Sequence, residues 1–146
     1  MNKELKLCLN VKVPTADDSY QNIGLKKNID FYSEPYECDE IYSIDVLNYI
    51  NADKLENYIE HLVSKLKRGG LLRLGGNDYI EISKMAIKQD FNVLEFNRII
   101  FGSSLVRPME SAITLTFITT ILARLNVRVL MKRINGYEFF IEAERL

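Results

Sequence analysis

Several residues of this chain have the types that catalysis needs, but their spacing is unspecific. The adjacent acids Asp39-Glu40 and Asp17-Asp18 are candidates for general acid and base catalysis. Adjacent acids, however, more often flank a strand at the protein surface. His61 lies beside the apolar stripe of a predicted helix, where a surface position is more frequent than a role as general base. Ser103-Ser104 has no matching base motif, so a hydrolytic triad has little support.

Metal and disulfide chemistry have no pattern in the sequence. Cys8 and Cys38 are the only cysteines, and they form neither a CxxC motif nor a disulfide framework. The single histidine, His61, cannot build a histidine metal site. We therefore expect no metal, and a reducing, cytoplasmic setting fits best. Gly75-Gly76 has two equal interpretations: a close approach to a ligand at the end of a strand, or a tight turn.

Length and charge narrow the class of protein further. The chain has 146 residues, 47% hydrophobic and 27% charged, which predicts a single globular domain spanning residues 1–146. Its 19 basic and 20 acidic residues give no net field, so we expect neither nucleic acid nor an anionic membrane as a partner. The longest uncharged segment, 111–123, falls short of the roughly 20 residues of a membrane span. The N-terminal sequence has no pattern of a secretion signal.

Alternating and helical patterns predict where the elements lie. Leucine alternation predicts a first strand, and a stripe of Leu55, Tyr58, Ile59, Leu62 and Leu66 predicts a helix that Asn51 caps and Gly69-Gly70 ends. Further helices are predicted from Asp78 to about Lys88, from Asp90 to about Phe101, and over 111–125. The predicted strands are 5–12, 21–24, 28–31, 39–44 and 71–74, the last broken by Gly75-Gly76.

The C-terminal segment has the most specific local pattern. Asn135-Gly136 separates two apolar-rich runs, 127–134 and 137–144, which predicts a hairpin with a two-residue type I′ turn. One face of the second run carries Tyr137, Phe139, Ile141 and Ala143. Strands alternating with helices and ending in a hairpin predict an α/β fold. It consists of an open, mostly parallel twisted sheet with flanking helices and an antiparallel edge.

Residues 38–76 resemble small class I S-adenosylmethionine-dependent methyltransferases. The segment CDEIYSIDVLNYI is similar to the fourth strand of that family and its following turn, and LKRGGLLRL is similar to its glycine turn and fifth strand. The hairpin VRVLMKRINGYEFFIEAE resembles the reversed last two strands of that fold. With the first strand included, the resemblance covers nearly the whole chain and implies a methyltransferase-like, Rossmann-like fold.

The departures from that family fall where it binds its cofactor. The family has a glycine-rich turn after the first strand, whereas this chain has Asn10-Val11-Lys12-Val13 and no glycine before Gly24. Glycine adopts backbone angles that are closed to valine, and it lets the backbone approach a ligand closely. The side chains of Val11 and Val13 would fill that space. The family also places an acid at the end of the second strand to bind the ribose. Here that position is Gly24.

The resemblance therefore leaves three functional hypotheses. The first is a pseudoenzyme: a fold without a cofactor that acts as a binding or structural module with a protein partner or in a homo-oligomer. The second is an active methyltransferase with a divergent motif, in which Asn10, Asp45 and Asn48 face a pocket of roughly 300 Å³ or more and bind S-adenosylmethionine. For Asp45, capping of the short turn before the helix is the simpler interpretation. The third hypothesis is a virus-encoded structural subunit.

Overall fold

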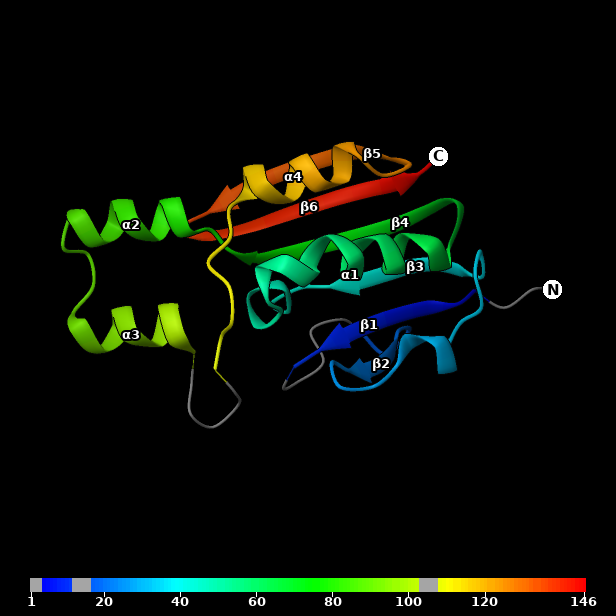
Figure 1. Cartoon of the computed structure of the whole chain (residues 1–146), viewed down its shortest axis with the longest axis horizontal. Helices are drawn as coiled ribbons and strands as arrows, with labels where there is room; N and C mark the ends of the chain where they lie inside the picture. The colour runs from blue at the N-terminus through cyan, green and yellow to red at the C-terminus, as the bar shows by residue number, and fades with distance from the viewer. Residues whose placement is uncertain (1–3, 12–16, 103–107) are drawn as a thin grey trace.

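Six strands form one mixed sheet. The computed structural model describes residues 4–11, 17–102 and 108–146. The strand order is β2-β1-β3-β4-β6-β5 (Figure 1). The first four strands of this order are parallel, and β6 and β5 are antiparallel to their neighbours, as the sequence predicts. The strands are β1 (Lys6–Asn10), β2 (Gln21–Gly24), β3 (Cys38–Ser43), β4 (Leu66–Asn77), β5 (Val127–Asn135) and β6 (Glu138–Arg145).

Two helices cover one face of the sheet. They are α1 (Ala52–Lys65), which Asn51 caps as predicted, and α4 (Leu115–Ala123) (Figure 1). Both helices contribute to the same hydrophobic core as strands β4 and β6, through Leu55, Ile59, Ile118, Ile121, Leu72, Leu74, Phe139 and Ile141. Helices α2 (Tyr79–Ile87) and α3 (Val93–Phe101) extend beyond the strand ends, and no residue of α3 is buried.

The opposite face of the sheet carries paired charges. Arg73 lies between Leu72 and Leu74, so its side chain points away from the helical face. Its Nη1 lies 2.9 Å from Glu40 Oε2, and its Nε lies 3.0 Å from Glu142 Oε2. Parallel sheets are usually covered on both faces. On this face an ion-pair network joins β3, β4 and β6.

The two glycine pairs of β4 differ from their predicted roles. Helix α1 ends at Lys65 and β4 begins at once, so Gly69-Gly70 lies inside the strand rather than ending the helix. Gly69 has a φ of 77° and lies at an irregularity in the strand pairing, where β4 has extra residues relative to β3. Gly75-Gly76 does not break the strand either, since β4 runs on to Asn77.

Other predicted bounds also shift. Residues 29–31 form a short 3-10 helix rather than a strand, because Asn28 accepts a hydrogen bond from the Asp30 amide and turns the chain. Asn92, and not Asp90, caps α3. Helix α4 begins only after Thr114, since Ile113 pairs with Asp78 in an isolated bridge.

The C-terminal hairpin is confirmed, with its turn one residue later than predicted. Asn135 pairs with Glu138, so Gly136 and Tyr137 are the two turn residues. Gly136 alone of these has a positive φ, 65°, as a type II′ turn requires. The predicted inward face is confirmed for Phe139, Ile141 and Ala143, which are buried.

Candidate functional site

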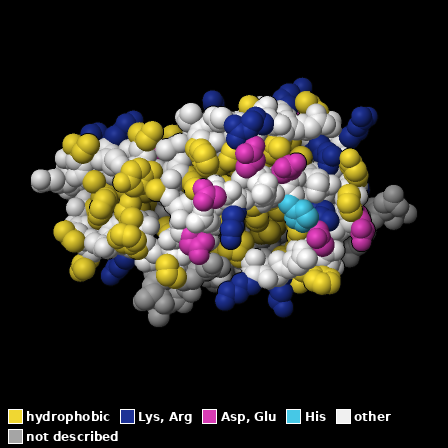
Figure 2. Space-filling view, viewed as in Figure 1, with side chains coloured by type: hydrophobic (Ala, Val, Ile, Leu, Met, Phe, Trp, Pro, Cys, Tyr) yellow, Lys and Arg dark blue, Asp and Glu magenta, His cyan; other side chains and the backbone are white. Residues whose placement is uncertain are grey.

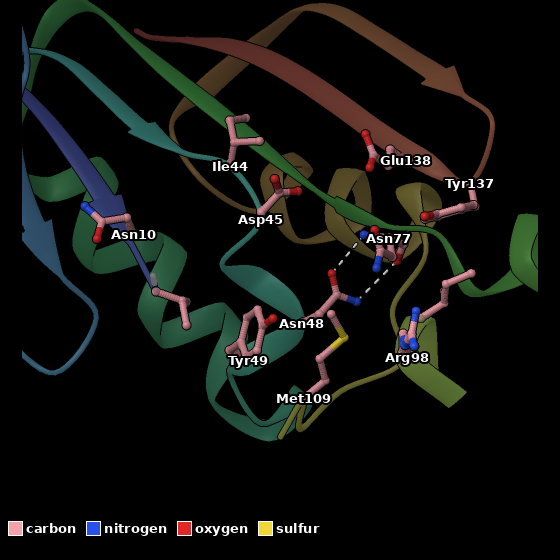
Figure 3. Close-up of a pocket in the computed structure, with 12 residues that line it drawn as sticks. Asn10, Ile44, Asp45, Asn48, Tyr49, Asn77, Arg98, Met109, Tyr137 and Glu138 are labelled. Carbon is pink, nitrogen blue, oxygen red and sulfur yellow. Dashed lines mark hydrogen bonds between the residues drawn. The ribbon is translucent and has the colours of Figure 1, made fainter. Parts of the chain in front are cut away.

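A pocket of about 360 Å³ lies at the carboxyl ends of the parallel strands (Figure 3). Ligands of open α/β sheets bind at this edge. The pocket brings together the three candidate residues of the sequence, from the ends of β1 and β3 and the turn that follows β3. Its lining consists of Asn10, Val11, Ile44, Asp45, Asn48, Tyr49, Asn77, Arg98, Ile99, Met109, Tyr137 and Glu138.

The Asn48 side chain forms hydrogen bonds with main-chain groups in the wall of the pocket. Its Oδ1 accepts a hydrogen bond from the Asn77 amide at 2.8 Å, and its Nδ2 donates to the carbonyls of Asn77 and Ser111, each at 3.3 Å (Figure 3). The residue is 5% exposed. The Asn48 side chain thus joins the end of β4 to the segment before α4, which leaves little of its amide for a ligand.

The glycine pair at the end of β4 is explained by the same contacts. A Cβ at Gly76 would stand 2.7 Å from Asn48 Oδ1, and one at Gly75 would stand 2.9 Å from Ile44 Cδ1. Side chains of the protein itself therefore occupy the space beside both glycines. Neither of the two predicted roles, ligand approach or tight turn, describes them.

Asp45 and Glu138 give the pocket an acidic side. Asp45 is exposed, and its φ of 59° lies in the left-handed region. Burial raises the pKa of Glu138, and the nearby Asp45 carboxylate raises it further. Burial and the same two carboxylates also raise the pKa of Tyr137. Asp45 is not at a capping position, because the N-cap position of the 3-10 helix η2 (Leu47–Tyr49) is Val46 and that of α1 is Asn51.

Strand β2 contributes no described residue to the pocket. Its end is close by in the sheet, since Gly24 pairs with Asn10 and the Leu25 amide donates to the Asn10 carbonyl at 2.8 Å. Gly24 offers no side chain there. The described pocket is therefore built on the ends of β1, β3, β4 and β6, together with α3.

The other candidate groups lie in ion pairs away from this pocket. Asp39 accepts from the Leu5 amide and Lys67 Nζ, and these bonds hold the pKa of its carboxyl below the usual range although burial opposes them. His61 Nε2 lies 2.9 Å from Asp30 Oδ1 on the surface. Val13 and Ser103-Ser104 lie outside the described residues.

The described residues contain no group of three or more His, Cys, Asp or Glu that could hold a metal ion. Cys8 and Cys38 are free and buried. Within the described part of the chain, no helix is long and apolar enough to cross a membrane.

Sequence reasoning missed the far wall of the pocket. Arg98, Tyr137 and Glu138 lie far from Asp45 in the sequence, and no motif marks them. One feature did point to two of them: β6 runs antiparallel to its neighbours, so its first residues must lie beside the carboxyl ends of the parallel strands. The position of Arg98 depends on how α3 packs, which periodicity does not predict.

Solved structures share this arrangement of strands and helices. A Pyrococcus horikoshii OT3 protein matches with a TM-score of 0.63 at 12% identity, covering 97% of this chain and 72% of its own. An S-adenosylmethionine-dependent methyltransferase from Mesorhizobium loti matches with a TM-score of 0.59 at 12% identity, covering 89% of this chain and 72% of its own. The chain has the class I methyltransferase fold.

A third match shows how much smaller this chain is than some of those enzymes. Magnesium protoporphyrin IX methyltransferase from Synechocystis PCC 6803, with bound S-adenosylhomocysteine, has a TM-score of 0.55 at 16% identity. The match covers 86% of this chain and 52% of the enzyme, so the chain spans about half of the enzyme's length. No protein-family model and no curated protein matches the sequence.

Proposed function

We propose that this chain is a methyltransferase-like domain that does not bind S-adenosylmethionine and works as a binding module within a protein assembly. The observation that carries the proposal is the end of β2. The family resemblance calls for a ribose-binding carboxylate there, and Gly24 supplies none. Beside it, Val11 lines the described pocket where that family has its glycine turn.

The donor set of the pocket also fits the cofactor poorly. The Asn48 amide is already bonded to backbone groups of Asn77 and Ser111. The acidic groups of the pocket, Asp45 and Glu138, lie on the side away from β2, and Asn10 is the polar lining residue at the end of β1. At the described ends of β1 and β2, a nucleoside would meet Val11 and the Asn10 amide, and no carboxylate for its ribose hydroxyl groups.

A surface feature favours the role in an assembly. The projecting helices α2 and α3 expose large apolar side chains, namely Ile80, Ile87, Val93, Leu94 and Phe101, which are exposed by 51%, 82%, 75%, 70% and 61%. Figure 2 shows apolar side chains gathered on that part of the molecule. Contiguous apolar surface of this kind typically marks an interaction site. The sequence-based expectation of a protein partner or homo-oligomer remains our proposal.

The competing proposal is an active methyltransferase with a divergent cofactor motif. One observation favours it: Asn10, Asp45 and Asn48 line a pocket of about 360 Å³. That volume exceeds the roughly 300 Å³ expected at the lower limit for small-molecule sites. Asp45 and Glu138 would suit the positive charge of a sulfonium ligand.

Thermal unfolding in the presence of ligand separates the two. A ligand that binds only the folded state stabilises it by about 2.7 kcal/mol when present at a hundred times its Kd. We expect the melting temperature of the full chain to be the same with and without S-adenosylmethionine or S-adenosylhomocysteine. A rise of several degrees with either compound, and none with methionine, would contradict the loss of cofactor binding and favour the competing proposal.

A further inference from the structure

Strand β5 forms an open edge of the sheet. It has nine residues, of which eight pair with β6, and it pairs on this side only. All of its residues except Val127 and Val129 are exposed. Among the described residues, no hydrogen bond joins the main chain of 128–135 to a segment other than β6. An edge of this length is a ready template for another extended chain.

Positive charge follows this edge on both faces of the sheet. Arg128, Lys132 and Arg133 are its three charged residues, and 127–135 contains no acid. Arg128 forms an ion pair with Glu144, with its Nη2 3.1 Å from Glu144 Oε2. Arg133 stacks on the Phe140 ring, with its Cζ 4.9 Å from the ring centroid. Lys132 has no ion pair with any described residue. In the register with β6, Lys132 lies opposite Ile141, on the face opposite to that of Arg128 and Arg133.

Exposed apolar side chains lie between and beside these charges. Leu130, Met131 and Ile134 are exposed by 44%, 40% and 42%. The register with β6 shifts between Val129 and Met131, which sets Leu130 out of the regular pairing. An extended segment with both acidic and β-branched side chains would complement this edge in charge and in hydrophobicity.

The same charges disfavour a second copy of this chain on the edge. Two β5 strands side by side would gather three basic residues from each copy without an acid between them. Like charges on paired strands are destabilising, and basic residues on an edge are a common protection against self-pairing. The projecting helices α2 and α3, by contrast, are apolar but give no indication of what covers them.

We propose that the β5 edge binds an extended acidic segment of another protein by adding it to the sheet as a further strand. The main-chain hydrogen bonds would supply affinity, and Arg128, Lys132 and Arg133 would select the acidic partner. This inference names the class of partner for the binding role proposed above and rests on that role.

Amide exchange with model peptides tests this inference. The probe is a fluorescein-labelled peptide as long as β5, nine residues, of alternating valine and glutamate, and its control alternates valine and lysine. We expect the glutamate peptide to bind, to bind more weakly as salt rises, and to slow hydrogen exchange at amides of 128–135. Equal binding of both peptides, or slowed exchange only at other segments, would overturn the inference.

Charge-reversal variants sharpen the test. Lys132→Glu with Arg133→Glu should weaken binding of the glutamate peptide at least about tenfold, as expected for loss of complementary interface charges. Lys26→Glu with Lys27→Glu, which changes the charge equally at the other end of the sheet, should leave it within about twofold. A β5 variant that binds like the native chain, or a native dimer that pairs through β5, would contradict the proposal. S-adenosylmethionine binding together with peptide binding at β5 would instead refute only the loss of the cofactor.

Discussion

At the residue scale, Asn48 is the side chain on which the pocket wall depends. Replacing it with alanine leaves the Asn77 amide and the Ser111 carbonyl without their partner in a partly buried place. We expect Asn48→Ala to lower the free energy of unfolding by about 1–3 kcal/mol. Asn57, on the exposed side of α1, is the matched control, and Asn57→Ala should change stability by less than about 0.5 kcal/mol. Urea denaturation measures both changes in the free energy of unfolding, and equal losses would contradict this role of Asn48.

The two carboxylates of the pocket allow a second prediction at this scale. Asp45→Asn keeps a residue type that tolerates a positive φ and removes one charge beside Glu138. We expect the pKa of Glu138 to fall toward its ordinary value while remaining raised by burial. Because a raised pKa makes the folded state less stable as pH rises through it, the variant should gain stability above that pKa and none below it. An NMR titration of the Glu138 carboxyl that shows no change would contradict this coupling.

At the element scale, Asp78 holds two helices. Its Oδ1 accepts from the Glu81 amide in α2 at 3.0 Å, and its Oδ2 accepts from the Leu115 amide in α4 at 2.8 Å. We expect Asp78→Ala to cost about 2 kcal/mol or more, since it removes the cap of α2 and a hydrogen bond to the first amide of α4, each worth about 1 kcal/mol. Asn92, the exposed cap of α3, provides the comparison. If Asn92→Ala costs as much in thermal denaturation, the double role is wrong.

The end of β4 provides a second test of an element. Gly76→Ala would place its Cβ 2.7 Å from Asn48 Oδ1, whereas Gly24→Ala would place its Cβ no closer than 3.9 Å to Lys27 Cγ. We expect the first change to cost about 1–3 kcal/mol, as overpacking typically does, and the second to be neutral within about 0.5 kcal/mol. The Asn48→Ala background should reduce the cost of Gly76→Ala. Strictly additive effects in a double-mutant cycle would contradict the close approach.

Local patterns predicted most elements but not where irregular segments begin. The stripe of α1 was predicted because burial on one face imposes a period on the sequence, and the hairpin was predicted because an Asn-Gly pair separates two apolar-rich runs. The structural roles of Gly69-Gly70 and Gly75-Gly76 depend on contacts with residues distant in the sequence, such as Cys38 and Asn48. The periodicity of the sequence does not predict such contacts. The sequence predicted Asn10, Asp45 and Asn48 at one edge of the sheet because they follow predicted strands. It missed Glu138, because the position of that residue depends on the pairing of β6 with β4.

At the scale of the whole molecule, Arg73 connects the charged residues on the face of the sheet opposite α1 and α4, through its ion pairs with Glu40 and Glu142. Burial raises the pKa of Glu40, but hydrogen bonds from Tyr20 and Arg73 outweigh it and leave that pKa lowered. A lowered pKa stabilises the fold above the ordinary value of the carboxyl, and the benefit is lost as pH falls through the lowered one. Arg73→Met should therefore reduce stability at neutral pH more than at acidic pH. A loss independent of pH would contradict the network.

The proposed loss of cofactor binding is tested most directly by isothermal titration calorimetry of the full chain with S-adenosylmethionine. The ends of β1 and β2 offer Val11 and Gly24 where the family would bind the nucleoside, so we expect no binding heat at millimolar ligand. The same sample should bind the valine–glutamate peptide, which shows that the protein is folded and active in binding. A micromolar dissociation constant for S-adenosylmethionine would contradict the proposed function and favour an active methyltransferase.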